Sequence, residues 1–538
     1  MPGPKSNCER QQIEDTFSGV SENLQMTRAA ASLVIVLMVF AAGCVSVPSL
    51  DGRVASRALD DTADTRLGRA VAERSTSHPG QAGIYALGDA REAFAARALL
   101  ASSADRSLDV QYYIWNDDET GYLLFEALWQ AAERGVRVRL LLDDNNTSGL
   151  DSILAALDAH PNIEVRLYNP LFHRRVRAIN YVASFSRVNR RMHNKSFTAD
   201  NQVTIVGGRN VGNEYFDSGD GVWLKDLDVI AVGPVVRDVS TAFDQYWNSE
   251  SAYPAALLLN AAGKADKAAL LNKFAEIRAS DKSEVYLDSL RDTPLVQSLL
   301  EGSLPMEWTA AQLFCDDPAK TIDPEANRES LLLPTLLRSM QPPQQSFDLV
   351  SPYFVPGKEG AAAIAALASR GVKVRILTNS LSATDVAAVH AGYAKRRTGL
   401  LHAQVKLYEL KPTIVADKRR EKSSRGSSSA SLHAKTFAVD GERVFVGSFN
   451  FDKRSAYLNT ELGLLLESTA LARRLSATLD EALPQVAYEV KLAADGKDVE
   501  WIDASGAQPD QFSSEPNSSA LRRGMVSFLS ILPIEWLL

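Results

Sequence analysis

The chain has 538 residues, of which 45% are hydrophobic and 23% charged, and its formal net charge is −8 at pH 7. This length is too great for one ordinary domain, and this composition excludes a polytopic membrane protein. The net negative charge argues against a protein that coats nucleic acid through bulk positive charge. No nucleic-acid partner is therefore expected, although a local basic groove stays open.

The N-terminal region contains a candidate targeting signal. Residues 1–25 are polar and form an extension of uncertain role, and residues 26–44 carry a basic residue ahead of a short apolar run. The run is too short to favour a spanning helix and is typical of a secretory signal, with an uncleaved anchor as the alternative. Its end resembles a bacterial lipobox, although Ala41 stands where leucine is usual. That resemblance implies that Cys44 is lipidated and that the protein is a bacterial, membrane-associated lipoprotein facing the periplasm.

The cysteine count leaves little scope for disulfides or thiolate metal sites. The chain has three cysteines, Cys8, Cys44 and Cys315. If Cys44 is acylated and Cys8 is removed with the signal, Cys315 is alone. No intramolecular disulfide is then expected, even in an oxidising periplasm.

Residues 81–254, which follow a charged tether predicted over residues 45–80, alternate between helical and strand patterns. Helices are predicted over residues 89–104 and 123–135, and strands over residues 107–115, 135–144 and 163–169. Such alternation predicts an α/β domain whose sheet is covered by helices.

The second half of the chain repeats this order. Residues 255–341 form a helix-rich connection to which no chemistry is assigned. Residues 342–490 then show the same succession of patterns, with Tyr408 standing 240 positions after Tyr168. This duplication predicts two similar α/β domains, each a mixed sheet flanked by helices, related by a pseudo-twofold axis.

Two stretches of the second half lie outside the repeated pattern. The charged and serine-rich run of residues 417–431 is predicted to be an exposed loop. Residues 491–538 form a C-terminal extension that ends in an apolar tail, too short to span a bilayer. We expect the tail to pack in the core, with a position at the membrane surface as the alternative.

Two motifs, one in each half, carry the candidate chemistry. The second has the spacing H-x-K-x4-D followed by a G-S-x-N group, formed by His433, Lys435, Asp440, Gly447, Ser448 and Asn450. The first has the matching residues 240 positions earlier, which are His193, Lys195, Asp200, Gly207, Gly208 and Asn210. Two gapless copies do not arise by chance, so the pair is far more specific than either motif alone.

The motif residues have the chemistry of a phosphoryl-transfer site. The alternating pattern around His433 and Lys435 predicts a strand, and residues i and i+2 of a strand share one face. An imidazole with a pKa near neutrality serves as a nucleophile or proton carrier, and an adjacent ammonium group can hold the anion.

The paired motifs resemble the signature of the phospholipase D superfamily. Their flanks, including LDVQYYIWNDDETG and the terminal LPIEWLL, are most similar to bacterial cardiolipin synthases of the C type. The resemblance runs from about residue 80 to the end of the chain. It implies two phospholipase D-like domains with the active site where they meet.

The resemblance implies a role for each motif residue. His193 is expected to attack phosphorus and form a phosphohistidine, and His433 to act as general acid and then base, although the pseudo-symmetry leaves this order open. The phosphate oxygens are expected to be bound by Lys195, Lys435, Asn210, Asn450 and Ser448. We expect no metal and no other cofactor, because the lysines and asparagines can replace a metal and no cluster with metal-ligand spacing occurs.

Carboxylates are expected to orient the two imidazoles. The resemblance assigns Glu461 to His433. Alignment of the two halves assigns Asp226 to His193, with Asp228 as a close alternative.

The two signature aspartates, Asp200 and Asp440, are grouped with the catalytic motif. Each follows its histidine by seven positions, at a predicted turn. An aspartate at a turn usually makes local hydrogen bonds, so we expect these two to fix a strand end rather than touch substrate.

The leading hypothesis for the function is phosphatidyl transfer through a phosphohistidine. Phosphatidylglycerol would be the acceptor, to give cardiolipin, and phosphatidylethanolamine is a possible donor. The alternatives are a hydrolytic phospholipase D, a phosphodiesterase or nuclease, and an inactive lipid-binding lipoprotein. A nuclease would need a basic channel with stacking aromatics, which the net negative charge disfavours. The sequence does not indicate the oligomeric state.

Overall fold

The computed structural model describes residues 48–216, 225–300, 303–323, 328–412, 432–532 and 535–538. The predicted signal with Cys44, and the charged loop of residues 417–431, lie outside these ranges. The chain divides into two compact units, formed by Met1–Ser49 with Leu171–Asn189 and by Leu50–Pro170 with Arg190–Leu538. Both copies of the histidine motif belong to the second unit.

The described part of the first unit contains two short helices, α6 (Ala178–Ala183) and α7 (Phe185–Val188). The side chain of Asn180 ties α6 to the loop ahead of it. It accepts a hydrogen bond from the N–H of His173 and donates one to the carbonyl of the same residue. No candidate catalytic residue lies among these residues.

The first half of the second unit is built on a nine-stranded sheet in the order β8-β4-β3-β2-β5-β6-β7-β1-β9. Its strands are β1 (Ala82–Leu87), β2 (Ser107–Tyr112), β3 (Arg137–Asp143), β4 (Ile163–Tyr168), β5 (Ser196–Ala199), β6 (Val203–Gly207), β7 (Asp228–Val232), β8 (Ala252–Pro254) and β9 (Glu307–Thr309). Strands β2, β3 and β4 run parallel, whereas β5, β6, β7 and β1 pair in antiparallel fashion. The sheet is therefore mixed, as the sequence predicts.

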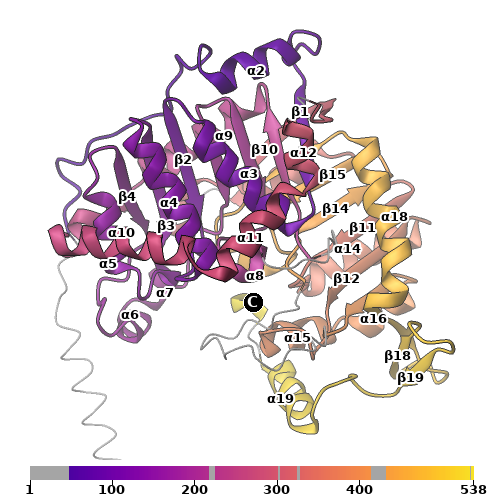
Figure 1. Ribbon diagram of the computed structural model, residues 1–538. Helices are drawn as coiled ribbons and strands as arrows, with labels where there is room; N and C mark the ends of the chain where they lie inside the picture. The colour runs from indigo at the N-terminus through magenta and orange to yellow at the C-terminus, as the bar shows by residue number, and fades with distance from the viewer. Residues whose placement is uncertain (1–47, 217–224, 301–302, 324–327, 413–431, 533–534) are drawn as a thin grey trace, which may run out of the picture. The chain divides into compact units, whose positions relative to one another are not determined.

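Helices cover both faces of this sheet (Figure 1). α3 (Ala90–Ser103), α4 (Glu119–Glu133) and α5 (Asp151–Asp158) pack on one face around a large apolar core. α9 (Val235–Trp247) packs on the other face through Phe243 and Trp247. Burial on both faces explains why the central strands are buried along nearly their whole length.

The second half of this unit is built on a ten-stranded sheet in the order β10-β16-β15-β14-β11-β12-β13-β17-β18-β19. Its strands are β10 (Ala311–Cys315), β11 (Ser346–Val350), β12 (Lys373–Asn379), β13 (Lys406–Leu410), β14 (Thr436–Val439), β15 (Arg443–Gly447), β16 (Leu462–Leu466), β17 (Ala487–Leu492), β18 (Val499–Asp503) and β19 (Asp510–Phe512). α14 (Gly357–Ser369) and α16 (Arg397–His402) pack on one face, and α18 (Thr469–Val486) packs on the other.

The two sheets repeat one topology. The order β4-β3-β2-β5-β6-β7-β1 in the first matches β13-β12-β11-β14-β15-β16-β10 in the second. An ion pair between neighbouring parallel strands is also duplicated, because Arg139 Nε lies 2.6 Å from Asp109 and Arg375 Nε lies 2.8 Å from Asp348. The prediction of two similar α/β domains is confirmed.

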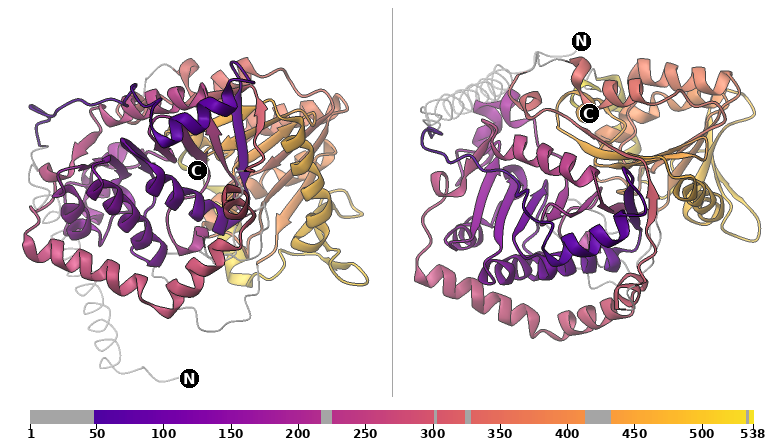
Figure 2. Two further views of the ribbon diagram at one scale, coloured as in Figure 1. Left: turned by 45° about the horizontal axis from the view of Figure 1, so that its top comes forward. Right: turned by 90° about the horizontal axis from the view of Figure 1, so that it is seen from above.

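A shared core joins the two domains, which lie side by side (Figure 2). Val206 and Val229 of the first sheet belong to the same buried apolar cluster as Val446 and Leu464 of the second. Strands β6 and β7 of the first sheet therefore pack against β15 and β16 of the second, and this packing brings the two motifs close together.

One segment differs from its prediction. The tether of residues 45–80 is packed from residue 50 onward, because Arg53 donates to the carbonyls of Asn248, Ser249 and Ala252 and a helix, α2 (Arg66–Ser75), follows. The tether prediction is therefore wrong for this part, since its charged residues find partners on the first domain.

The connection between the domains is rich in helices, as its sequence pattern predicts, and it also contributes two short strands. It contains α10 (Lys264–Arg278), α11 (Asp281–Arg291), α12 (Pro294–Leu300) and α13 (Leu332–Ser339), but its strands β9 and β10 complete one sheet each. Cys315, at the end of β10, is a free thiol.

The C-terminal extension adds strands to the second sheet and ends in α19 (Ala520–Ile531). Val526 is the one buried residue of α19, so the expectation that the apolar tail packs in the core is wrong for this helix. Among the residues that the structure describes, no helix is long and apolar enough to cross a membrane.

Candidate active site

The backbone around each histidine pairs with the opposite domain. The N–H of His193 donates to the carbonyl of Thr460 at 2.9 Å, and the N–H of His433 donates to the carbonyl of Lys225 at 2.7 Å. Thr460 and Lys225 immediately precede the two predicted orienting carboxylates. Each histidine is therefore fixed against the segment that carries the carboxylate of the other half.

The carboxylates pair with the histidines in the reverse of the predicted order. Nδ1 of His193 lies 2.8 Å from Oε2 of Glu461, and Nδ1 of His433 lies 2.6 Å from Oδ2 of Asp226. The equivalence of Asp226 and Glu461 is sound, but the assignment of each to the histidine of its own half is wrong. At the domain interface, the segment that carries each carboxylate lies beside the histidine of the other half. An alignment of the two halves cannot reveal this pairing, because it compares equivalent positions and not contacts.

The alternative carboxylate, Asp228, has a different partner. Its Oδ2 lies 2.9 Å from Arg97, and its Oδ1 accepts from the N–H of Arg209, all three side chains being buried. Asp228 is therefore occupied by an ion pair within the first domain, and the prediction that it orients His193 is wrong.

The environment of Glu461 explains the small residues of the G-[GS]-x-N group. Ser448 donates its hydroxyl to Oε2 of Glu461 at 2.5 Å, so the prediction that this hydroxyl binds phosphate is wrong. Its counterpart is Gly208, where an added Cβ would lie 2.2 Å from Oδ1 of Asp226. The first carboxylate thus approaches so closely that no side chain fits, whereas the second is held by a serine.

Asp316 is a site residue that the sequence analysis missed. Its Oδ2 accepts from the N–H of Glu461 at 2.9 Å and from Lys320 at 2.8 Å. It lies in the connection between the domains, just after β10, and no spacing marks it. Only the pairing of β10 with β16 places it beside Glu461.

The two lysines are buried and equivalently placed. Nζ of Lys195 donates to the carbonyl of His193 at 2.6 Å, and Nζ of Lys435 donates to that of His433 at 2.6 Å. Burial and the proximity of the other ammonium group lower the pKa of Lys195 well below its ordinary value, and burial lowers the pKa of Lys435 to about 8. A phosphodiester anion between them would favour the protonated form of both.

The two histidines differ in their electrostatics. Burial and the two lysines lower the pKa of His193 well below its ordinary value. The pKa of His433 is lowered by burial and Lys435, but the Asp226 carboxylate opposes the shift. Despite its burial Asp226 has a lowered pKa, because His433 and Arg209 stabilise its anion, whereas burial raises the pKa of Glu461 to about 7. His433 is therefore the better placed of the two to carry a proton.

The two motif asparagines have unequal surroundings. Oδ1 of Asn210 accepts from the N–H of Ile114 at 3.1 Å, and its Nδ2 lies 3.3 Å from the hydroxyl of Tyr215. Oδ1 of Asn450 is buried and has no hydrogen-bond partner among the described residues. Phosphate binding by these side chains stays a prediction. Asn450 has fewer side-chain hydrogen bonds to other described residues than Asn210.

The signature aspartates are structural, as the turn position predicts, and they are wrongly grouped with the catalytic residues. The carboxylate of Asp200 accepts from the N–H groups of residues 105–107, and that of Asp440 accepts from those of residues 344–346. Both have positive φ, of 51° and 56°. Each therefore closes a turn and holds the start of the neighbouring strand, β2 or β11.

Two tyrosines that the sequence analysis missed flank the imidazoles. The ring of Tyr113 meets that of His193 edge-on at 4.9 Å between centroids, and the ring of Tyr215 meets that of His433 at 5.1 Å. Tyr113 directly follows β2, so its position at the end of a central strand was the available signal.

A family model described as the PLD-like domain of cardiolipin synthase matches residues 98–247 and 336–483, one block for each histidine motif. The chain belongs to this family. This match and the similarity to the relatives described next show that the protein is a phosphatidyltransferase of the phospholipase D superfamily.

Relatives of this PLD-like protein share most of its length. It is 47% identical over 480 residues to "Cardiolipin synthase C" of Escherichia coli, which covers 88% of this chain and 100% of that protein. It is 31% identical over 458 residues to an uncharacterized protein of Helicobacter pylori, which covers 84% and 89% of the two chains. The crystal structure of phosphatidylserine synthase from Haemophilus influenzae matches 87% of this chain and all of that one, with a TM-score of 0.51 and 13% identity, a likeness of fold alone.

Among the described residues, one cluster of side chains has the residue types that bind metals. His390, Glu409 and Glu515 place ligand atoms within 4.8 Å of one another. The guanidinium of Arg397 lies 3.0 Å from Glu409 and 2.6 Å from Glu515. Because this cation already compensates both carboxylates, the cluster is a buried ionic network rather than a vacant metal site.

Proposed function

We propose that the protein is a cardiolipin synthase that transfers a phosphatidyl group to phosphatidylglycerol. The observation that carries this proposal is the cross-paired site, in which two histidines are each held through Nδ1 by a carboxylate of the other domain. A buried lysine donates to the backbone carbonyl of each histidine. The identity of 47% to "Cardiolipin synthase C", over the whole of that protein, supports the choice of acceptor.

In the first half of the reaction, Nε2 of His193 attacks phosphorus of the donor phospholipid and forms a P–N bond. The bond from phosphorus to the headgroup oxygen breaks, and His433 gives its Nε2 proton to that oxygen. The electrostatics favour this order, because the nucleophile must be neutral and the acid must be protonated. His193 has the strongly lowered pKa, and His433 has the ionised partner Asp226.

In the second half, a glycerol hydroxyl of phosphatidylglycerol gives its proton to Nε2 of His433 and attacks phosphorus. The P–N bond breaks, His193 returns to its neutral form, and cardiolipin leaves. Lys195 and Lys435 hold the nonbridging oxygens throughout. Their positive charges stabilise the transition state, because negative charge on these oxygens is greatest there. Water in place of the hydroxyl would give phosphatidic acid instead.

Product analysis tests the acceptor. Purified full-length protein is given mixed vesicles with labelled phosphatidylglycerol, alone and with phosphatidylethanolamine. Cardiolipin that forms with the wild type and not with His193→Ala supports the proposal, and a requirement for phosphatidylethanolamine identifies the donor. Phosphatidic acid as the sole product would make the protein a hydrolytic phospholipase. DNA cleavage without any lipid product would make it a nuclease.

A trapping experiment tests the order of the histidines. A labelled phosphatidyl donor with a nitrophenyl leaving group needs no general acid for its departure. His433→Asn should therefore still acquire the label, whereas His193→Asn should not. Label retained by His193→Asn and lost by His433→Asn would exchange the two roles.

We also propose that the protein is held on a bacterial membrane by acylation of Cys44 and faces the periplasm. This rests on the short apolar run that ends at that cysteine. Several acyl chains, at about 0.8 kcal/mol for each buried methylene, are enough for stable attachment. Labelling of cells with a radioactive fatty acid should mark the wild type and not Cys44→Ser. Equal labelling of the two would contradict lipidation at this residue.

A further inference from the structure

Arg209 fills the variable position of the first G-[GS]-x-N group and is buried in the first domain. Its guanidinium donates to the carbonyls of Leu87, Gly88 and Asp226, at 2.8, 2.6 and 2.9 Å. Asp226 carries the carboxylate that holds Nδ1 of His433. Arg209 therefore fixes the backbone from which this carboxylate projects.

A second buried arginine and one carboxylate complete a charge cluster around Arg209. Asp228 lies 2.9 Å from the guanidinium of Arg97 and 3.4 Å from that of Arg209, and it accepts from the N–H of Arg209 at 3.1 Å. Two guanidinium groups thus share one carboxylate, which leaves one positive charge without a partner. A buried charge is costly unless an opposite charge lies nearby, and Asp226 supplies that charge.

The cluster keeps Asp226 in its carboxylate form. Burial acts to raise the pKa of Asp226, but His433 and also Arg209 stabilise the anion, and this pKa is lowered to about 2. The proton that Asp226 and His433 share therefore stays on the imidazole. The other titratable groups that face this pair are Lys195, Lys435 and Tyr215.

The second half of the chain has uncharged residues at the two equivalent positions. Phe449 stands 240 positions after Arg209 and belongs to the apolar core of the second domain. Gly463 takes the place of Asp228, since each of these two residues pairs across its sheet with the first glycine of its own G-[GS]-x-N group. At these positions the second domain therefore carries no counterpart of the charge cluster.

The carboxylate that orients the other histidine has a different electrostatic environment as a result. The N–H of Glu461 donates to Asp316, whose charge is compensated by Lys320 at 2.8 Å. Burial raises the pKa of Glu461 to about 7. The two orienting carboxylates thus occupy equivalent places in the two halves but favour different protonation states.

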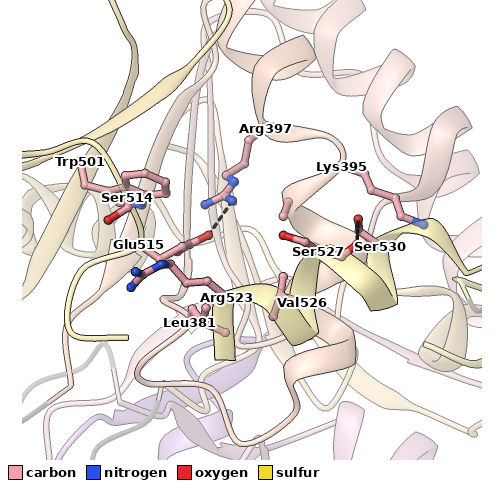
Figure 3. Close-up of a pocket in the computed structure, with 11 residues that line it drawn as sticks. Leu381, Lys395, Arg397, Trp501, Ser514, Glu515, Arg523, Val526, Ser527 and Ser530 are labelled. Atoms are coloured by element: carbon pink, nitrogen blue, oxygen red, sulfur yellow. Dashed lines mark hydrogen bonds and ion pairs between the residues drawn. The ribbon is translucent and has the colours of Figure 1, made fainter. Parts of the chain in front are cut away.

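The buried arginine Arg397 of the second domain belongs to another region. Its guanidinium lies 3.0 Å from Glu409 and 2.6 Å from Glu515, and it lines a cavity of about 340 Å³ (Figure 3). None of the residues that line this cavity belongs to the histidine site. Arg397 is therefore a matched comparison for Arg209, because it is a buried guanidinium with carboxylate partners away from the catalytic pairs.

We propose that Arg209 is a positioning residue that makes His433 the general acid of the reaction. It holds the backbone of Asp226 and keeps the side chain of Asp226 ionised, so the proton of the pair stays on the imidazole. The imidazolium then gives its Nε2 proton to the departing headgroup oxygen and becomes neutral. A neutral imidazole beside a protonated Asp226 is a far weaker acid.

A single position outside the H-x-K-x4-D motifs thereby breaks the pseudo-symmetry of the site. The first half has arginine there and the second has phenylalanine, so the two imidazoles are equivalent in place but not in charge. This inference rests on the proposed function, since it takes His433 to act on the leaving group.

The leaving group tests the acid step. Arg209→Gln should slow transfer in mixed vesicles of phosphatidylglycerol and phosphatidylethanolamine by roughly tenfold or more, because their headgroup oxygens need a proton to leave. Transfer from the labelled nitrophenyl donor needs no such proton and should slow by less than about threefold. Arg209→Lys keeps the charge and should recover most of the loss on vesicles. Equal slowing with both donors would overturn the proposal, since a general loss of structure affects them alike.

Two comparisons separate this role from a structural one. In an Asp226→Asn background, Arg209→Gln should cost no further activity on vesicles, because the guanidinium acts through that carboxylate. Arg397→Gln should lower stability but leave the ratio of the two donor rates at its wild-type value. An additive loss in the double variant, or the same change of ratio in Arg397→Gln, would overturn the proposal.

Nitrogen NMR of the imidazole tests the inference without any turnover. In full-length protein with isotopically labelled histidine, the signals of His433 are those that disappear in His433→Asn. At a pH where the wild type shows an imidazolium, Arg209→Gln should show a neutral imidazole, and Arg209→Lys should keep the imidazolium.

Arg97→Gln is the second variant for this measurement and serves if Arg209→Gln does not fold. It leaves Asp228 to Arg209 alone, so the cluster loses its excess positive charge while the three carbonyl bonds of Arg209 remain. The same change in the signals of His433 is expected. An imidazolium that persists in both variants would overturn the proposal. Wild-type protein that is inactive with both donors would fail the proposed function, and the NMR result would still decide the role of Arg209.

Discussion

The imidazole of His193 is hydrogen-bonded at 2.8 Å to Glu461, a residue 268 positions later in the other domain. The mirror relationship joins His433 to Asp226. Neither domain therefore holds a complete catalytic pair, and each imidazole is oriented by a carboxylate that arrives only when the two domains associate.

The crossed pairing predicts which substitution moves the pH profile. Asp226 is ionised beside His433 and raises the pKa of that imidazole. Asp226→Asn should lower the pKa of His433, so that this histidine loses its proton at a lower pH. The alkaline limb of the plot of kcat/KM against pH should therefore move to lower pH. The rate at the optimum should fall by roughly 10²–10⁴-fold.

The matched control for this profile is Glu461→Gln, which acts on His193. It should reduce the rate but leave the alkaline limb in place. If the alkaline limb moves with Glu461→Gln and not with Asp226→Asn, the crossed pairing is wrong and each carboxylate acts on the histidine of its own half.

Asp440 is predicted to serve stability more than catalysis. Its carboxylate accepts three backbone N–H bonds at the start of β11. Asp440→Ala should lower the free energy of unfolding by about 1–3 kcal/mol, since charge-assisted bonds are lost at a residue with positive φ. Asp440→Asn keeps one acceptor and tolerates that φ, and it should recover much of the loss. Urea unfolding measures both, and activity per folded molecule should change little in either variant.

The raised pKa of Glu461 predicts a pH-dependent cost in stability. Burial raises this pKa from 4.5 to about 7. Between pH 4.5 and about 7, Glu461 therefore keeps a proton in the folded state that it has released in the unfolded state. The contribution of this proton to the free energy of unfolding is complete below pH 4.5 and is lost as the pH rises to about 7. The slope for one proton is at most about 1.4 kcal/mol for each pH unit.

Glu461→Gln removes this titration. The free energy of unfolding of the variant, relative to that of the wild type, should increase between pH 4.5 and 7 and level off above. Denaturant unfolding at a series of pH values measures the difference. A constant difference across this range would show that Glu461 titrates normally.

The placement of both lysines predicts that the reaction needs no divalent metal. Lys195 and Lys435 can supply the positive charge at the phosphate. Chelation with EDTA should leave the rate unchanged, whereas Lys435→Met should reduce it by orders of magnitude. A strict requirement for added Mg²⁺ or Ca²⁺ would contradict the assignment of the phosphate to the lysines.

The sequence by itself determined which residues are available for the chemistry. Two copies of H-x-K-x4-D at a constant offset of 240 positions identify His193, Lys195 and their counterparts. Alternating apolar patterns identify two α/β domains, and a turn position identifies Asp440 as structural. These properties are local, since strand periodicity and turn chemistry depend on residues only a few positions apart.

Only the tertiary structure decided which of these residues act together. The partner of His193, the use of Ser448 on Glu461 rather than on phosphate, and the place of Asp316 all follow from how two similar sheets share one core. A pseudo-symmetric sequence is equally compatible with pairing within each half or across the halves. The choice between them is made by packing at the domain interface, to which residues from both halves of the chain contribute.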